Sequence, residues 1–324
     1  MTISVALCTY NGEKFLEEQI NSILDQTIAV HEIVVCDDRS TDATLSILDN
    51  YLETYPEVFK IFRNDTTLKS VKNFEKAISL CTGDIIFLAD QDDYWYKDKV
   101  ETILNFFNHH RNINVICTNG HAIDNESRFL ENHFVTWDVF LQFTNETSNF
   151  SLFDFLIQKG NFATGASMAF RKSIKDFILP IPEIKGFHHD EYIALVAASN
   201  DEIAFIGEKL INYRIHSSQQ VGGIAYHHDK FDYQEILDYF KWNADNSVND
   251  FKTLKRRIKS QIIWYNKYMP IYKEKISEKA FNRIKNGFLQ RLNTNIAMMK
   301  SRHPVKYKIL STADKILNKR QLKN

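Results

Sequence analysis

Short apolar runs alternate with amphipathic stretches over the first 120 residues of this 324-residue chain. A run of four to eight apolar, β-branched or aromatic residues is typical of a buried strand, and apolar residues spaced three and four apart are typical of a helix. These patterns predict strands at residues 3–8, 32–36, 59–64, 83–90 and 114–120, and helices at 12–24, 41–52, 71–81 and 97–110, the second of them capped by Ser40. Because strands joined by helices of ten or more residues pair in parallel, we expect an α/β fold with a mostly parallel central sheet between helical layers.

The rest of the chain is less regular before it becomes helical. The patterns predict strands at residues 165–171, 202–207 and 208–216, and a helix at 190–199. From about residue 228 the period is helical, and one helical face carries Leu254, Ile258, Ile262, Tyr265 and Met269. We therefore expect an α/β domain over residues 1–228 and a helical extension over residues 229–324.

The formal net charge is −1, but the charge is unevenly distributed. Residues 1–224 hold 18 basic and 32 acidic side chains, a net charge of −14, whereas residues 225–324 hold 22 and 9, a net charge of +13. A basic helical extension is compatible with binding to an anionic lipid surface, with a dimer contact and with packing on the first domain. It is equally compatible with an ordinary solvated helical face.

Neither a membrane span nor a disulfide framework is predicted. No apolar run approaches about 18 residues, and the N-terminus lacks the charged region and long apolar stretch of a signal peptide. The four cysteines, Cys8, Cys36, Cys81 and Cys117, form no C-x-x-C pair, so we expect free thiols. These features predict a cytoplasmic protein, with peripheral contact at the inner face of the cell membrane as the alternative.

The stretch FLADQDDYW places Asp90, Asp92 and Asp93 directly after an apolar run. Like charges this close repel one another, and each carboxylate costs free energy if it is desolvated without a partner. Carboxylates at the carboxyl end of a strand suit Mg²⁺ or Mn²⁺, which bind through one or two carboxylates together with substrate phosphates. The pattern therefore indicates a divalent cation with a diphosphate. The alternative is an acidic helix N-terminus, which the helix dipole stabilises.

The nucleotide-binding motifs of other α/β enzymes are absent from this sequence. No G-x-G-x-x-G follows the first strand, and no G-x-x-x-x-G-K-[ST] occurs. The first strand ends instead in CTYNGE and the second in CDDRSTDAT. There, Asp38 can accept a hydrogen bond from the N3–H of uracil or thymine, and Tyr10 can stack on the ring. A nucleotidyltransferase would need a basic phosphate-binding loop after the first strand, and TYNGEKF does not supply one.

Five segments follow one another along the chain: SVALCTYNGEKFLEEQI, EIVVCDDRSTDAT, VKNFEKAISLCTGDIIFLADQDDYW, HDEYIALVA and YRIHSSQQVG. Together they resemble the inverting family-2 glycosyltransferases over about residues 2–224. The resemblance implies the Rossmann-like glycosyltransferase A-type fold, a nucleotide-diphosphate sugar as donor, and Mg²⁺ or Mn²⁺ as cofactor. DQDDYW followed by HDEYIALVA is most similar to the rhamnosyltransferase-like branch of bacterial surface-polysaccharide enzymes. That branch implies dTDP-L-rhamnose as the donor, with a UDP-hexose or UDP-N-acetylhexosamine as the alternative.

The same resemblance implies roles for individual residues. Asp190 is the expected catalytic base, which takes the proton of the acceptor hydroxyl in a direct displacement that inverts the anomeric carbon. The expected donor-binding residues are Thr9, Tyr10, Asp38, Asn64, Lys72, Asp90 and Arg214. The residues expected at the metal are Asp92, Asp93 and His216, and those expected at the acceptor are Gly165, His189 and Trp95.

Several of these residues also fit a structural role. Asp190 can be a helix N-cap, His216 and His189 can be ordinary histidines, and Trp95 can be a packing residue. Lys72 stands where many relatives carry Arg, so it would neutralise phosphate as a point charge.

The implied partners are the nucleotide sugar and a saccharide or polyprenyl-linked acceptor, with a homodimer as a further option and no nucleic acid. The Q-x-x-R-W signature of processive synthases is absent, which favours an enzyme that adds a single sugar. The remaining alternative is a non-catalytic nucleotide-sugar-binding homologue, against which the intact set of Asp38, Asp92 and Asp190 argues.

Overall fold

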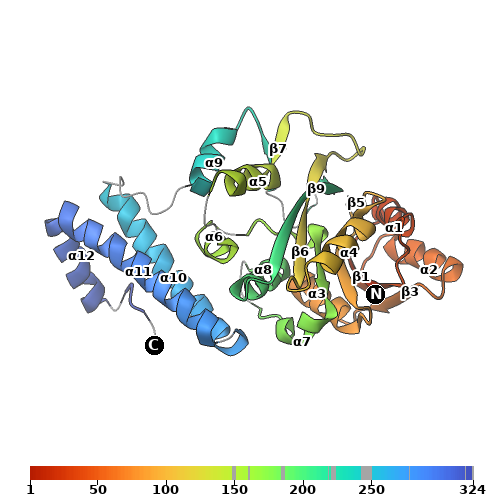
Figure 1. The fold of residues 1–324 in the computed structure, drawn as a ribbon, viewed down its shortest axis with the longest axis horizontal. Coiled ribbons are helices and arrows are strands. Elements are labelled where there is room, and N and C mark those ends of the chain that lie inside the picture. The colour runs from red at the N-terminus through yellow and green to blue at the C-terminus, as the bar shows by residue number, and fades with distance from the viewer. Residues whose placement is uncertain are drawn as a thin grey trace. The chain divides into compact units, whose positions relative to one another are not determined.

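The computed structural model describes residues 1–147, 151–159, 161–183, 187–217, 219, 224–241, 250–276, 278–317 and 319–322. The chain divides into two compact units, Met1–Lys241 and Trp242–Asn324. The first unit combines a sheet with helices, and the described part of the second is helical (Figure 1).

An eight-stranded sheet forms the centre of the first unit, in the order β3-β2-β1-β4-β8-β6-β9-β5. Its strands are β1 (Ile3–Thr9), β2 (Glu32–Asp37), β3 (Phe59–Arg63), β4 (Ile85–Asp90), β5 (Tyr94–Trp95), β6 (Val115–Ile123), β8 (Met168–Arg171) and β9 (Ile203–Arg214). Strands β1 to β4 pair in parallel, β8 is antiparallel to both of its neighbours, β9 is parallel to β6, and β5 is antiparallel to β9. A second, small ladder joins β7 (His133–Val135) to β10 (Ala225–His227). The predicted α/β fold with a mostly parallel sheet is confirmed.

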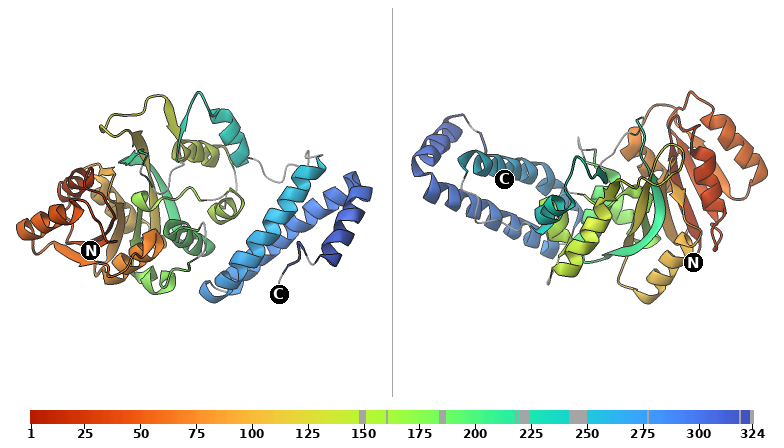
Figure 2. Two further views of the ribbon diagram at one scale, coloured as in Figure 1. Left: turned by 180° about the vertical axis from the view of Figure 1, so that it is seen from behind. Right: turned by 90° about the horizontal axis from the view of Figure 1, so that it is seen from above.

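Helices cover both faces of the sheet (Figure 2). They are α1 (Leu16–Leu24), α2 (Thr44–Thr54), α3 (Lys69–Leu80), α4 (Lys99–His109), α5 (Thr136–Glu146), α6 (Leu152–Lys159), α7 (Lys175–Ile178), α8 (His189–Ser199) and α9 (Tyr233–Lys241), with short 3₁₀ helices at Gly165–Ser167 and Lys172–Ile174. The crossovers from β1 to β2 and from β2 to β3 both lead toward the same edge of the sheet. The crossover from β3 to β4 leads back to the other side of β1. Because parallel crossovers are right-handed, α1 and α2 share one face and α3 covers the other.

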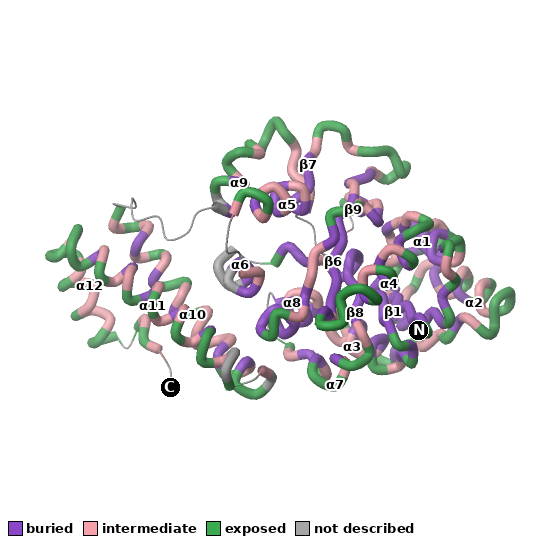
Figure 3. Tube along the Cα trace, viewed as in Figure 1, coloured by how far each residue is buried: buried purple, intermediate pink, exposed green. Residues whose placement is uncertain are grey.

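The core follows the sheet of the first unit, where many of the buried segments lie along the central strands (Figure 3). The interior residues of β1, β2 and β4 are almost all inaccessible to solvent. Strands that are buried on both faces have no polar side, which is why they read as unbroken apolar runs in the sequence. All four cysteines are free thiols, as expected.

Three local predictions were wrong. The two strands expected at 202–207 and 208–216 form the single strand β9, whose ladder with β6 shifts register on either side of Asn119. Strand β5 was not predicted, because two residues are too short to give a pattern. Helix α2 begins at Thr44 and not directly after Ser40, because the Ser40 hydroxyl donates to Asp37 and does not cap the helix.

The two units divide later than the predicted boundary at residue 228. Helix α9 lies in the first unit, where Leu237 and Phe240 are buried. The Phe240 ring meets those of Phe143 on α5 and Phe155 on α6, with centroid distances of 6.2 and 5.0 Å. Because α9 completes this aromatic core, residues 229–241 belong to the α/β part.

The second unit is built from α10 (Phe251–Lys275), α11 (Glu278–Arg302) and α12 (Pro304–Ile316). Its core cluster consists of Leu254, Ile258, Ile262, Phe288, Leu292 and Met299. The predicted apolar face of the first of these helices is confirmed, since three of its residues belong to that cluster. Among the described residues, no helix combines the length and the hydropathy needed to cross a membrane.

Glu32, at the start of β2, holds the amino ends of neighbouring strands together. Its carboxylate accepts hydrogen bonds from the Ser4 hydroxyl, from Lys60 Nζ at 2.5 Å and from the Thr82 N–H at 2.6 Å. Burial raises the pKa of Glu32, but the bonds from Lys60, Ser4 and Thr82 outweigh burial and lower that pKa from 4.5 to about 2. The ionised carboxylate therefore stabilises the fold.

The Glu32→Gln variant is expected to lose roughly 2 to 3 kcal/mol of unfolding free energy at neutral pH. The folded-state pKa of Glu32 lies below the unfolded value, so its contribution is complete above about pH 4.5 and disappears as the pH falls toward 2. Urea unfolding of both proteins across this range should show the difference in free energy shrinking toward acid. A difference that stays constant with pH would contradict the assignment.

Candidate functional site

The carboxyl ends of β1, β2 and β4 meet at one edge of the sheet. In the ladders, Thr9 of β1 pairs with Asp37 of β2, and Cys8 pairs with Asp90 of β4. The Thr9 hydroxyl donates to Asp37 Oδ2 at 2.9 Å, and the Asp38 N–H donates to the Thr9 carbonyl at 2.8 Å. In open parallel sheets, ligands bind outside this edge.

The residues expected at the base of the nucleotide lie at this edge. Asp38 is buried, and its carboxylate accepts hydrogen bonds from Asn64 Nδ2 at 2.9 Å, from the Leu68 N–H at 2.7 Å and from the Lys69 N–H at 2.8 Å. A carboxylate offers about four acceptor positions, and these bonds from the described residues occupy three of them. Tyr10, which follows Thr9, is 44% exposed and can offer its ring.

Gln91 joins the loop after β1 to the loop after β4, a contact that the sequence did not predict. Tyr10 donates its N–H to Gln91 Oε1 at 2.7 Å, and Gln91 Nε2 donates to the Tyr10 carbonyl at 3.0 Å. A Cβ atom on Gly12 would lie 2.3 Å from Gln91 Oε1, so a larger residue there would displace the Gln91 amide from these bonds. The signal in the sequence is a glycine three residues beyond the end of β1.

Asp90, Asp92 and Asp93, here named the acidic cluster, carry more negative charge than their surroundings compensate. Burial and the charges of Asp92 and Asp190 raise the pKa of Asp90 to about 8. Burial and the charges of Asp92 and Asp90 also raise the pKa of Asp93. Asp93 Oδ2 is buried, and within the described part of the chain it has no hydrogen-bond partner. The cluster is therefore a place where an added positive charge is stabilised.

Asp92 and His216 form the part of this region that fits a divalent cation. The side chain of Asp92 is 14% exposed, and its Oδ2 lies 2.8 Å from His216 Nε2. No three His, Cys, Asp or Glu side chains of the described residues are grouped so that they could hold a metal ion by themselves. Mg²⁺ and Mn²⁺ at nucleotide sites need only one or two protein ligands, because substrate phosphates supply the rest. The donor set thus fits Mg²⁺ or Mn²⁺.

Lys99 is the principal residue of the site that sequence reasoning missed. Its ammonium group is buried, donates to the Ala166 carbonyl at 2.8 Å and lies 3.9 Å from the centroid of the Trp95 ring. Burial lowers the pKa of Lys99 well below its usual value, and the charges of Asp93 and Asp90 oppose that shift. Lys99 thus supports the acidic cluster from the protein interior, and it connects the cluster to the Gly165–Ser167 turn.

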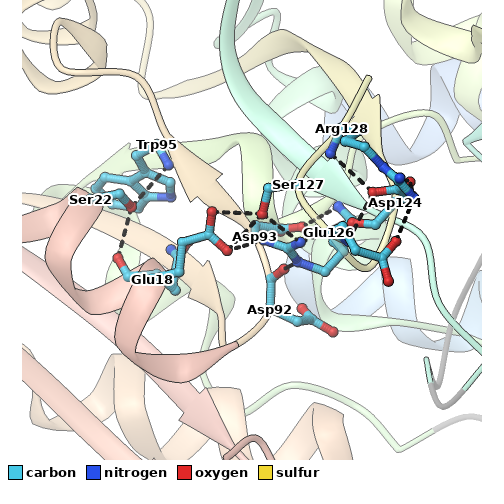
Figure 4. A network of polar contacts seen from close by, with 11 residues as sticks. Glu18, Ser22, Asp92, Asp93, Trp95, Asp124, Glu126, Ser127 and Arg128 are labelled. Carbon is cyan, nitrogen blue, oxygen red and sulfur yellow. Dashed lines mark hydrogen bonds and ion pairs between the residues drawn. The ribbon is translucent and has the colours of Figure 1, made fainter. Parts of the chain in front are cut away.

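Arg214 was expected at the donor phosphates, and the structure does not support that role. Its side chain is fully buried, and its guanidinium donates to the Asp92 carbonyl, the Asp124 carbonyl, the Ser127 hydroxyl and Glu18 Oε2, at distances between 2.5 and 2.9 Å. Figure 4 shows Glu18 joined to Ser127 in this network, beside Asp92 and Asp93. Arg214 instead fixes the backbone of the acidic cluster to α1 and to the loop after β6.

Asp190 lies in the first turn of α8 and is held by three donors. Its Oδ2 accepts the Gly165 N–H at 3.1 Å, and its Oδ1 accepts the Glu191 N–H at 2.7 Å and Asn161 Nδ2 at 3.3 Å. The helix begins at His189, so Asp190 is not the N-cap. The carboxylate is partly accessible, and its charge acts on the pKa of Asp90 across the site. A strand end and a helix start thus bring two acidic groups together from positions 100 residues apart.

Two of the residues expected at the acceptor lie in the core. Trp95 is fully buried, and its ring centroid lies 5.6 Å from that of Phe87, so the packing alternative holds. His189 is 5% exposed and stacks on Phe74 with centroids 3.9 Å apart. Burial lowers the pKa of His189 to about 4, so this ring is neutral at physiological pH. Neither ring is open to a sugar.

Lys72 also lies away from the expected phosphate contact. Its Nζ atom is 2.8 Å from Glu75 Oε2 on the same helix and donates to the Ile181 carbonyl at 2.9 Å. These bonds join α3 to the segment after α7. Neither partner of Lys72 in these bonds belongs to the acidic cluster.

Gly165 is required by the packing of His189 beside Asp190. A Cβ atom on Gly165 would lie 2.7 Å from His189 Nε2, and the His189 ring cannot retreat because it stacks on Phe74. The Gly165→Ala variant is therefore expected to displace Asp190 and to lower kcat by about 10- to 100-fold. Gly207→Ala is the matched control, since its Cβ would meet Leu141 at an ordinary 3.5 Å.

A compensating variant tests the cause of this effect. If the clash causes the loss, adding His189→Ala to Gly165→Ala should restore part of kcat in a steady-state assay. A double variant no more active than Gly165→Ala alone would contradict the clash.

A cavity of about 200 Å³ lies beside β6 and β9, outside the acidic cluster. Its lining residues are His121, Ala122, Phe129, Leu130, Glu131, His133, Val135, Asp138 and Lys209. Asp138 and Lys209 form an ion pair of 3.0 Å across it, and the Phe129 side chain is 56% exposed at its side. The His121 ring centroid lies 6.2 Å from that of Tyr96, which follows the acidic cluster. The lining combines hydrogen-bonding groups with an open aromatic ring.

Comparison with known proteins gives a family and two informative relatives. Residues 4–178, more than half of the chain, match the family model described as glycosyl transferase family 2. The dTDP-rhamnosyl transferase RfbG of Shigella flexneri is 38% identical over 102 residues, which are 30% of this chain and 35% of RfbG. Chondroitin synthase of Escherichia coli is 32% identical over 138 residues, which are 43% of this chain and 20% of that protein. The chain thus matches about a third or less of the length of these relatives.

Solved structures show a related fold. The structure of S. aureus TarS residues 1–349 in complex with UDP has a TM-score of 0.52 at 16% identity, covering 94% of this chain and 92% of that chain. At this identity the likeness concerns the fold alone.

Proposed function

Because the chain belongs to glycosyl transferase family 2, we propose that it transfers a sugar from a nucleoside diphosphate donor to a saccharide or polyprenyl-linked acceptor. One observation carries this proposal: the Gly165–Ser167 turn binds Asp190 through the Gly165 N–H and binds Lys99, which lies beside the acidic cluster, through the Ala166 carbonyl. The acidic cluster suits the diphosphate with its cation, and Asp190 suits the acceptor hydroxyl. A nucleotide-binding protein without activity would need no carboxylate in the position of Asp190.

The proposed reaction is a direct displacement with inversion. The acceptor oxygen forms a bond to the anomeric carbon, the bond from that carbon to the diphosphate oxygen breaks, and Asp190 takes the acceptor proton. The N–H of Gly165 and the amide of Asn161 orient the Asp190 carboxylate for this transfer. When bound, Mg²⁺ or Mn²⁺ offsets the negative charge of the leaving diphosphate. Asp92 and His216 would hold the cation, with Asp93 behind them.

The proposed donor is dTDP-L-rhamnose, supported by the similarity to RfbG over part of the chain. The alternative is a UDP-hexose or UDP-N-acetylhexosamine, because uracil and thymine present the same N3–H to the Asp38 carboxylate. We propose that Thr9, Tyr10 and Asn64 complete this base-binding edge.

The proposed acceptor is a bacterial surface-polysaccharide precursor at the cytoplasmic face of the membrane. The cavity lined by His121, Asp138 and Lys209 supports a saccharide chain, since its polar groups can satisfy sugar hydroxyls and Phe129 can pack on a sugar face. These residues replace Trp95 and His189 as the proposed acceptor contacts.

The test is binding and turnover with a panel of donors. Thermal shift with Mn²⁺ and dTDP-rhamnose, UDP-glucose, UDP-N-acetylglucosamine or GDP-mannose should give a metal-dependent shift that is largest for dTDP-rhamnose. Product NMR with a saccharide acceptor should then show an inverted anomeric configuration. A larger shift with a UDP-sugar would replace the donor and keep the mechanism. Binding without nucleoside diphosphate release on any acceptor would favour the non-catalytic alternative, and a retained configuration would contradict the mechanism.

A further inference from the structure

Helix α12 carries an apolar stripe that nothing in the second unit covers among the described residues. Val305, Ile309 and Ile316 are 71%, 67% and 77% exposed, and Leu317 at the helix end is 57% exposed. At 100° per residue, the first three fall within an arc of about 40°. Single exposed apolar residues are ordinary, but a row of them along one helix marks an interaction surface.

The opposite side of the same helix is occupied. Tyr307 and Leu310 pack against the core cluster of the second unit, and no residue of α12 is fully buried (Figure 3). The helix is thus attached by one side and presents the apolar stripe on the other. A helix of 13 residues is marginal by intrinsic propensity alone, so packing on the second unit stabilises α12. That packing also determines which side of the helix is exposed.

Basic side chains border the apolar stripe. Lys308 and Lys315 lie on one side of it and Lys306 on the other, and all three are exposed. The single acidic residue of α12, Asp314, is paired with Arg320 and is not exposed. The surrounding residues 251–324 hold 20 basic and 3 acidic side chains, a net charge of +17.

We propose that α12 lies in the surface of an anionic membrane, with its apolar stripe in the acyl-chain boundary and its lysines among the lipid headgroups. An apolar stripe between rows of lysine, on a helix that cannot span the bilayer, is the pattern of interfacial helices. A second copy of this chain fits less well, because its own lysine rows would be brought against these. An anionic lipid surface supplies the complementary charge. This proposal is independent of the donor and of the sugar chemistry.

Vesicle co-sedimentation of the full chain tests the proposal. The protein should partition onto phosphatidylglycerol-containing vesicles more strongly than onto pure phosphatidylcholine, and high salt should weaken the binding. The Ile309→Glu, Ile316→Glu double variant should reduce the partition coefficient by at least about tenfold, because it places two charges in the apolar boundary. Phe177→Glu is the matched control, since Phe177 is 64% exposed on α7 in the first unit.

A lysine variant separates the two contributions. Changing Lys306, Lys308 and Lys315 to Gln should remove most of the preference for anionic lipid while leaving a weak, salt-insensitive binding. Since all the substituted side chains are exposed, circular dichroism should show unchanged folds. Equal partitioning of wild type onto both vesicle types would overturn the proposal. So would unchanged binding of the isoleucine variant, or a concentration-dependent dimer in ultracentrifugation that the same variant dissociates.

Discussion

Replacing Asp190 by Asn is expected to lower kcat by about 10²- to 10⁴-fold, while the affinity for the nucleoside diphosphate stays within about twofold of wild type. An amide cannot take the proton of the acceptor hydroxyl, so the displacement loses its base. The shape of the side chain is nearly unchanged, and the Asn carbonyl can still accept the Gly165 N–H. The start of α8 therefore stays in place, and the loss is chemical.

The measurement pairs steady-state turnover with calorimetric titration of the nucleoside diphosphate in the presence of Mn²⁺. Glu191→Gln is the matched control, because it removes one negative charge from the same helix turn and keeps the Glu191 N–H that donates to Asp190. Asp190→Asn should lose turnover and keep binding, whereas Glu191→Gln should keep both. An Asp190→Asn enzyme with the turnover of wild type would sink the assignment of the base.

Much of the fold could be predicted because its strands are buried on both faces. β1, β2 and β4 appear in the sequence as unbroken apolar runs, and the helices between them fix parallel pairing. The other half of the sheet, formed by β8, β6, β9 and β5, has a weaker pattern in the sequence. β9 was read as two strands because Gly207 and Glu208 interrupt its apolar pattern, yet β6 pairs with it across the register shifts at Asn119.

The acidic cluster and the first turn of α8 could also be predicted, since in each the chemistry lies in consecutive residues. The roles of Arg214 and Trp95 could not be. Arg214 is held by Glu18 and Asp92, which are 196 and 122 residues away, so only the folded chain shows that its donors are occupied. Trp95 is fully buried, and its backbone N–H donates to the hydroxyl of Ser22, which is 73 residues away.

Lys99 shows most clearly which contacts cannot be predicted from the sequence alone. In the sequence it stands among Lys97 and Asp98, which are exposed, so it reads as one more solvated charge. Its position on the same helical face as Ile103 was the available signal. A lysine on a buried face needs a partner, and here the Ala166 carbonyl, the Trp95 ring and the nearby carboxylates provide one.

Replacing Asp92 by Asn is expected to remove the metal-dependent part of nucleotide affinity, a loss of at least about tenfold in Kd with Mn²⁺ present. The side chain of Asp92 is partly accessible and contacts His216, whereas Asp93 is buried. The amide oxygen is a weaker ligand than the carboxylate, and it no longer attracts the cation by charge. His216 alone would then have to hold the cation.

Calorimetric titration of dTDP and UDP with and without Mn²⁺, together with the electron paramagnetic resonance signal of bound Mn²⁺, gives readouts that do not depend on turnover. Asp98→Asn is the matched control, because Asp98 is exposed on the same segment and removes the same charge from the surface. In the absence of metal, Asp92→Asn should bind the nucleotide as well as wild type or better, since one repulsive charge near the diphosphate is gone. If Mn²⁺ strengthens nucleotide binding equally in wild type, Asp92→Asn and Asp98→Asn, then the cation lies elsewhere. The crowding of three carboxylates behind β4 would in that case be compensated by Lys99 and the backbone alone.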